Sequence, residues 1–221
     1  MFYLALAALK LLGYLLSWLP RKLFLAFGAG LGFALFKAGF RREVVESNLQ
    51  RAFPFLDRMQ REKFSRESYR EMGVLFLELI RLFFRFDRFV EAHCDVENEH
   101  HLREAVARGK GVFVMTAHIG NWEVLTASGH NLFSLPVTMV TKELRPAWLH
   151  RAVALTRELL GVKMALEPRT LPAILRSLKN GEIVGFVMDQ FAGAPVGARV
   201  PFFGVPVGSH TALAALALRT G

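Results

Sequence analysis

The segment Thr116–Glu123, with the sequence TAHIGNWE, contains the side chains whose types and spacing most favour catalysis. His118 follows Val112–Ala117, a short apolar and β-branched run that is typical of a buried strand. Ligands of open sheets bind at the carboxyl ends of such strands. Asn121 suits the N-cap of a following helix, and Glu123 falls in its first turn, folded back towards His118. A histidine backed by a carboxylate can act as a general base whose tautomer is fixed.

A structural histidine is the alternative. A lone histidine is more often a satisfied or surface side chain than a catalytic one. His118, however, lies at a strand end, next to a glycine turn and near a carboxylate. These features make a catalytic role as well supported as a structural one, and both interpretations stay open on the residues alone. A separate nucleophile is not required if the substrate supplies a hydroxyl.

Other constellations are weaker. The sequence has no GxSxG elbow and no HExxH motif. The run His93–His101 gathers His, Cys and acidic residues, but its spacing fits no tetrahedral zinc site, so we expect no metal. Arg145, Arg157 and Arg169 follow predicted strands or their helices and could clamp a phosphate, although solvated helix faces explain each equally well. Asp189-Gln190 ends an apolar run, where a simple turn is the plain interpretation.

Residues 111–221 alternate between two patterns. Short apolar runs predict strands at Val112–Ala117, Pro136–Thr141, Val162–Leu166 and Glu182–Asp189. Helical segments separate or follow them at Asn121–Asn131, Pro146–Leu160, Thr170–Lys179 and Ala212–Gly221. Strands alternating with helices predict an α/β core with a mainly parallel central sheet flanked by helices.

Residues 39–110 have a helical pattern, interrupted by Phe53-Pro54, which predicts two helices with an amphipathic face packed on the core. The apolar residues at helical spacing are Phe64, Tyr69, Met72, Leu75, Phe76, Leu79, Leu82 and Phe83.

Residues 1–38 are predicted to be a hydrophobic membrane anchor. Phe2–Pro20 approaches the roughly 20 apolar residues that span a bilayer, and it lacks the basic leader of a signal peptide. The basic residues that follow favour a cytoplasmic location for the rest of the chain. The GxxxG spacing in Gly28–Gly32 suits close helix approach, but a small-residue face against the domain or lipid is favoured over helix pairing within the membrane.

The charge of the chain restricts its partners. Among 221 residues, 28 are Lys or Arg and 19 are Asp or Glu, giving a net charge of +9. The apolar content of 52% excludes a disordered tail, and the single Cys94 excludes an internal disulfide framework. Partners with negative charge are expected. Nucleic acid is a poor candidate because the sequence has no stacking platform or recognition-helix signature.

The motifs together resemble a known family. His118 to Glu123 is similar to the HxxxxD/E motif of glycerolipid-type acyltransferases, in the HIGNWE form of the lipid A late acyltransferases. The similarity extends along nearly the whole chain, through Asn48-Leu49, Phe53-Pro54, Glu78, Arg157, Asp189-Gln190 and Val200–Gly204.

This resemblance implies an O-acyltransferase on the cytoplasmic face of the bacterial inner membrane, with no cofactor. Such an enzyme moves an acyl chain from an acyl carrier protein or coenzyme A thioester to a hydroxyl of a phosphorylated glycolipid, a lipid A precursor. His118 would deprotonate the hydroxyl and Glu123 would orient His118. Arg157 would contact phosphate or the oxyanion. The remaining substrate-binding residues implied are Asn121, Trp122, Arg145, Asp189 and Gln190.

Two alternatives remain, and one feature departs from the family. The acceptor could be another lipid, such as a phosphatidylinositol mannoside or a lysophospholipid, since the motif reports hydroxyl activation alone. A non-catalytic protein that binds anionic lipid is the second alternative. The family's chains continue beyond a helix like Ala212–Gly221, so we expect residues 111–221 to be a core that lacks its C-terminal part.

Overall fold

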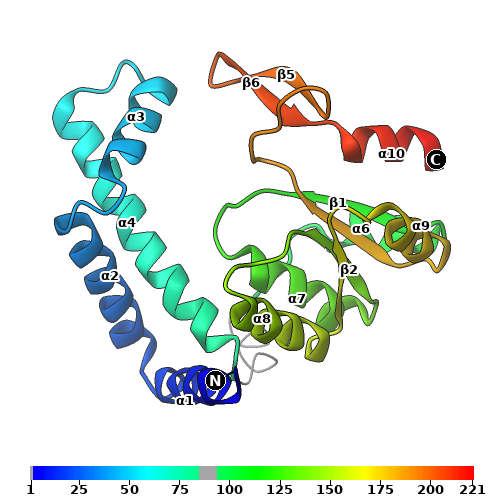
Figure 1. Ribbon diagram of the computed structural model, residues 1–221, viewed down its shortest axis with the longest axis horizontal. Helices are drawn as coiled ribbons and strands as arrows, with labels where there is room; N and C mark the ends of the chain where they lie inside the picture. The colour runs from blue at the N-terminus through cyan, green and yellow to red at the C-terminus, as the bar shows by residue number, and fades with distance from the viewer. Residues whose placement is uncertain (1, 85–93) are drawn as a thin grey trace.

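The computed structural model describes residues 2–84 and 94–221, apart from the side chains of residues 130–133. An arm of four helices precedes an α/β core (Figure 1). The arm contains α1 (Phe2–Ser17), α2 (Arg21–Lys37), α3 (Arg42–Ala52) and α4 (Arg58–Arg81). The core contains α6 (Glu99–Ala107), β1 (Val112–Thr116), α7 (Trp122–Phe133), β2 (Val137–Thr141), α8 (Ala147–Leu159), β3 (Val162–Leu166), α9 (Leu171–Lys179), β4 (Ile183–Val187), β5 (Gly197–Phe202), β6 (Val205–His210) and α10 (Ala212–Thr220).

The four strands predicted for the core are confirmed and form one fully parallel sheet in the order β1-β4-β2-β3. The helices predicted between and after them are also confirmed. The order of the strands places β4 between β1 and β2, with Thr116 opposite Val187 in the β1–β4 register. The carboxyl ends of β1 and β4 are therefore immediate neighbours.

Helices cover both faces of this sheet. On one face, Val184 and Phe186 of β4 pack with Ile174 of α9 and Leu213 of α10. On the other, Ile183 of β4 and residues of β2 and β3 pack with Leu102 of α6 and Leu160, which follows α8. The side chains of β4 alternate between the two clusters, as the pleat of a strand requires.

The helical arm is held together by an unusually close contact between α2 and α4, which lie side by side (Figure 1). The buried residues of α2 recur every fourth position: Phe24, Gly28, Gly32 and Phe36. Gly73 of α4 fits against this stripe so closely that a Cβ there would overlap the carbonyl oxygen of Gly28. The expected small-residue face of Gly28–Gly32 therefore packs against another helix of this chain.

The face predicted for the second amphipathic helix is partly wrong. α3 and α4 flank Phe53-Pro54 as predicted, and Asp57 and Gln60 form a capping box at the start of α4. However, Phe64, Met72 and Phe76 are exposed. Tyr69 is buried as predicted, and the other buried residues of α4 are Ser65, Gly73, Val74 and Ile80. Gly73 lets the backbones of α2 and α4 approach closely, and the face of α4 that contains it is therefore the one that packs. Residues 85–93 of this predicted segment lie outside the described residues.

The membrane anchor stays a prediction. Within the described residues, no single helix has both the length and the apolar character to cross a bilayer, and α1 has 16 residues. Judged by length and composition alone, α2 and α3 taken together are long and apolar enough to cross a bilayer, and the pair is bent by 95°.

The sequence patterns missed the antiparallel hairpin of β5 and β6. Pro201 pairs with Pro206 in its register, and proline normally argues against a strand. Both strands are edges of a two-stranded ribbon, so neither proline removes a hydrogen bond from a central strand. Phe203 and Gly204 form a two-residue turn with φ of 49° and 76°, and the Phe203 ring contacts Phe53 of the arm at a centroid distance of 5.1 Å.

The α2–α4 contact predicts opposite effects for two alanine substitutions in one helix. Gly32→Ala would place a Cβ against the Tyr69 carbonyl and should lower the free energy of unfolding by about 1–3 kcal/mol. A Cβ on Gly30 meets nothing within 4 Å, so Gly30→Ala should be neutral or stabilise the helix by up to about 1 kcal/mol. Denaturant unfolding of both variants measures the difference, and equal effects would contradict the close approach.

Candidate active site

His118 is fixed by Asp189 at the carboxyl ends of β1 and β4. The His118 Nδ1 lies 2.7 Å from Asp189 Oδ1, and the His118 backbone N–H donates to Asp189 Oδ2 at 2.8 Å. This two-point contact follows from the strand register, because His118 and Asp189 each lie two residues beyond the Thr116–Val187 pair. The ring and the carboxylate are each about one-third exposed, with 31% and 30% of their side-chain surfaces accessible.

The Asp189 carboxylate is held in its charged form. Partial burial raises its pKa, but the hydrogen bonds from the His118 ring and backbone outweigh burial, and the pKa of Asp189 is lowered overall. A lowered folded-state pKa contributes stability above the pKa of the unfolded chain, and this contribution is lost as the pH falls through the folded-state value. An ionised carboxylate has no proton to donate, so the Nδ1 of His118 is the donor in this contact. Nε2, which lies 3.5 Å from the Gln190 Nε2, is then the ring nitrogen that can accept.

The turn after His118 leads directly into α7. Gly120 adopts a φ of 60°, and the Asn121 Oδ1 accepts the backbone N–H of Val124 at 3.1 Å, as predicted for an N-cap. Trp122 follows and presents its ring edge-to-face with His118 at a centroid distance of 4.7 Å. The ring of His118 is therefore restrained by Trp122 as well as by Asp189.

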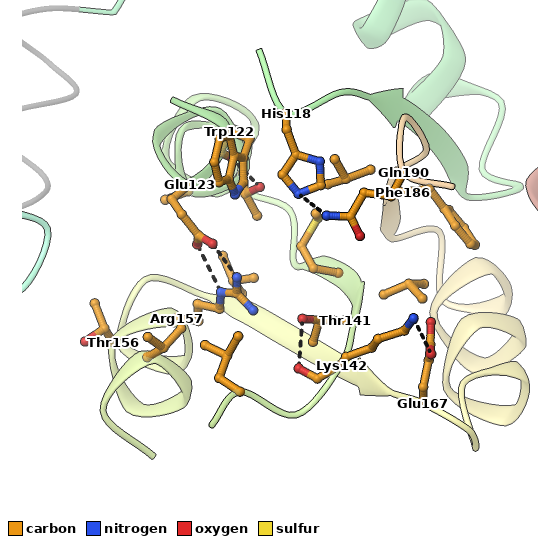
Figure 2. A pocket seen from close by; sticks show the side chains of 18 of the residues that line it. His118, Trp122, Glu123, Thr141, Lys142, Thr156, Arg157, Glu167, Phe186 and Gln190 are labelled. Atoms are coloured by element: carbon orange, nitrogen blue, oxygen red, sulfur yellow. Dashed lines mark hydrogen bonds and ion pairs between the residues drawn. The ribbon is translucent and has the colours of Figure 1, made fainter. Parts of the chain in front are cut away.

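Glu123 has a different partner from the one we expected. Its carboxylate accepts hydrogen bonds from the Arg157 guanidinium of α8, through Nε at 3.0 Å and through a second, shorter contact from Nη2 (Figure 2). This ion pair is mostly buried, with 14% of Arg157 and 18% of Glu123 exposed. The carboxylate that contacts His118 is thus Asp189, and the contact between Glu123 and Arg157 joins α7 to α8.

His118, Glu123 and Arg157 border one cavity of about 990 Å³ (Figure 2). Its lining is mainly apolar and includes Phe186 of β4 and Leu149 of α8. The arm also contributes to it, through Leu9 of α1 and through Phe76, Leu79, Ile80, Leu82 and Phe83 of the α4 region. Apolar side chains from α1, the α4 region and α8 therefore lie beside the polar cluster.

The remaining predicted site residues divide into two groups. Gln190 and Trp122 line the cavity, and Gln190 Nε2 lies 3.5 Å from His118 Nε2 (Figure 2). Arg145 and Arg169 are exposed and are not among the cavity-lining residues. Sequence reasoning missed Lys142 and Glu167, which line the cavity and pair at 3.5 Å; they follow β2 and β3, and that position at strand ends was the available signal.

His93, the first residue of the predicted histidine-rich run, lies outside the described residues. Within residues 2–84 and 94–221, no group of three or more His, Cys, Asp or Glu side chains is arranged to hold a metal ion.

The fold and this cluster define an α/β protein with a histidine–carboxylate pair at the carboxyl ends of parallel strands, beside an apolar cavity. Residues 1–221 match the model of the bacterial lipid A biosynthesis acyltransferase family, and the chain belongs to that family.

Individual relatives are distant. The chain is 28% identical over 165 residues to the lipid A biosynthesis palmitoleoyltransferase of Escherichia coli K12, which covers 75% of this chain and 53% of the relative. It is 25% identical over 201 residues to the lipid A biosynthesis lauroyltransferase of the same organism, covering 90% of this chain and 64% of the relative. A lipid A biosynthesis acyltransferase of Haemophilus influenzae is 25% identical over 170 residues, covering 76% of this chain and 52% of the relative. The chain thus spans about half to two-thirds of the length of these curated relatives.

The Glu123–Arg157 pair predicts a stability effect that a contact with His118 would not. Glu123→Gln leaves the mostly buried Arg157 charge without its carboxylate, so the free energy of unfolding should fall by about 1–3 kcal/mol. Arg157→Gln combined with Glu123→Gln should recover part of that loss. Glu143→Gln, in the exposed loop before α8, serves as the control for urea unfolding. Additive losses in the double variant would contradict the coupling.

Proposed function

We propose that this protein is a membrane-associated O-acyltransferase that moves a fatty acyl chain from a thioester to a hydroxyl of a lipid A precursor. The observation that carries the proposal is His118, held through Nδ1 by Asp189 at the edge of an apolar cavity of about 990 Å³. Family membership and relatives named as lipid A palmitoleoyl- and lauroyltransferases support the reaction class.

His118 acts as the general base in this proposal. Its Nε2 takes the proton from the acceptor hydroxyl as that oxygen attacks the thioester carbonyl, and Asp189 stabilises the imidazolium that forms. The tetrahedral intermediate then collapses, the carbon–sulfur bond breaks, and the thiolate leaves with the proton from Nε2. The products are the acyl ester and the free carrier thiol.

Glu123 and Arg157 serve the same site from the other side of the cavity. Glu123 was predicted to orient His118 directly; its ion pair supports a different role, in which it holds the Arg157 guanidinium beside the cavity. A guanidinium placed there suits a phosphate or a developing oxyanion, because it presents several fixed N–H donors. Gln190 and Trp122 border the reacting groups, and Asn121 fixes the start of α7.

The apolar part of the cavity accommodates the acyl chain in this proposal. Burial of each CH₂ contributes roughly 0.8 kcal/mol, so a long chain gains considerable affinity from walls such as Phe76, Leu79 and Phe186.

The partners follow from charge and exposure. Acyl carrier protein or coenzyme A supplies the acyl thioester, and a phosphorylated glycolipid accepts the chain; both kinds of partner are anionic and suit a chain with a net charge of +9. Exposed apolar side chains on α1 and α2, such as Leu4 at 77% and Phe27 at 60%, support association with the cytoplasmic face of the bacterial inner membrane.

The catalytic role of His118 predicts a large loss of turnover on its removal. His118→Ala should lower kcat by about 10³-fold, since general-base catalysis typically contributes 10²- to 10⁴-fold. The assay measures transfer from acyl carrier protein and from coenzyme A thioesters to a lipid A precursor in detergent, read by mass spectrometry. His101→Ala, an exposed histidine of α6, is the matched control. Full activity of the His118 variant would rule out this base.

A separate prediction tests Asp189 as the partner of His118. Asp189→Asn keeps the size of the side chain but can donate to Nδ1 and so favours the wrong tautomer, which should lower kcat by about 10²-fold or more. Asp95→Asn removes an exposed carboxylate as the control. An unchanged kcat and pH–rate profile of Asp189→Asn would show that another group orients the histidine.

A further inference from the structure

Glu78 of α4 joins two distant segments of the chain. Its Oε1 accepts a hydrogen bond from Arg21 Nη1 at 3.1 Å, and its Oε2 accepts one from Asn121 Nδ2 at 3.2 Å. Arg21 is the first residue of α2, whereas Asn121 caps α7. Only 13% of the Glu78 side chain is exposed, so the carboxylate is largely removed from water.

The contact uses both ends of the Asn121 amide. Its oxygen accepts the Val124 backbone N–H at 3.1 Å while its nitrogen donates to Glu78, and each assignment requires the other. Trp122 and Glu123 are the first two residues of α7 and both line the cavity, so the position of this cap determines where both side chains lie.

The charges around Glu78 make its carboxylate hard to replace. The guanidinium groups of Arg21 and Arg81 both lie over the Phe24 ring, at 5.8 and 5.6 Å from its centroid. Burial lowers the pKa of Arg81 and its neighbour Arg21 lowers it further, whereas Glu78 acts in the opposite direction. Without the Glu78 charge, two like charges would face each other at the junction of α2 and α4.

We propose that Glu78 is a positioning residue, which couples the start of α2 to the N-cap of α7 and so places the segment from His118 to Glu123 against the cavity. The consequence for turnover rests on the proposed acyltransferase function; the structural coupling does not. Through this link, a displacement of α2, whose other face carries exposed apolar side chains, reaches the candidate active site.

A competing explanation is that apolar packing alone positions α7 on the arm. Leu82 packs with Val124 and Ala127 of α7, and this contact does not involve Glu78. The two explanations differ in one respect: only a polar link makes substitutions of Glu78 and Asn121 interdependent.

Glu78→Gln and Asn121→Ser test the link, separately and together, in the full-length protein. Serine retains a good N-cap but does not reach Glu78. Amide hydrogen exchange of the unliganded protein reports whether the N-cap of α7 keeps its position. Each single variant should speed exchange of the amides of residues 121–126 by about 3- to 10-fold, and the double variant should add no more than about two-fold. Glu62→Gln, which removes an exposed ion pair within α4, is the control and should change nothing there.

Turnover supplies the second readout. Glu78→Gln should lower kcat by about 10-fold with KM for the acyl donor changed by less than about two-fold, because a displaced site impairs reaction geometry more than binding of the chain. If Glu78→Gln does not fold, Arg21→Gln interrupts the link at its exposed end and should produce the same exchange pattern in smaller measure.

Unchanged exchange at residues 121–126, or additive effects of the Glu78 and Asn121 substitutions, would overturn the coupling. Absence of acyl transfer by the unmodified protein, or full transfer by the His118→Ala variant, would instead contradict the proposed function, and the exchange result would still decide the role of Glu78.

Discussion

The parallel pairing of β1 with β4 is the constraint on which the candidate site depends. Thr116 and Val187 are opposite one another, so chain segments that leave the two strands in the same direction keep His118 and Asp189 in contact. The backbone hydrogen bonds of the sheet therefore fix the points from which the two segments leave their strands, one of which is the bond from the Met188 N–H to the Thr116 carbonyl. Changing the strand order would separate the histidine from its carboxylate without altering either residue.

A second constraint acts from outside the sheet. The α4 region contributes a wall of the cavity and also contacts α7, through Leu82 and through Glu78. α4 also lies directly against α2, where Gly32 and Gly73 allow the two backbones to approach. Gly28 and Gly32, whose spacing also suits helices that pack within a membrane, thus help to position a helix that lines the cavity.

The sequence predicted the elements of the core well and their mutual contacts poorly. The four strands and the helices between them follow from local apolar periodicity, and each boundary lies within a few residues of the prediction. Strand order is a long-range property, and no local pattern places β4 beside β1. Consequently Asp189 was recognised as a residue at a strand end, while its contact with His118 was not. The hairpin of β5 and β6 escaped because Pro201 and Pro206 suppress the usual strand signal.

Asp189 contacts His118 in place of the expected Glu123, and this has a simple electrostatic reason. Glu123 lies on the first turn of α7, facing α8, where the Arg157 guanidinium offers it two N–H donors in a plane. Asp189 lies nearer to His118 and receives both the ring and the backbone N–H. Each carboxylate thus takes the partner that satisfies the larger number of its lone pairs. The spacing of His118 and Glu123 in the sequence thus places the histidine before the turn and the carboxylate that pairs with Arg157 after it, and all three side chains line the same cavity.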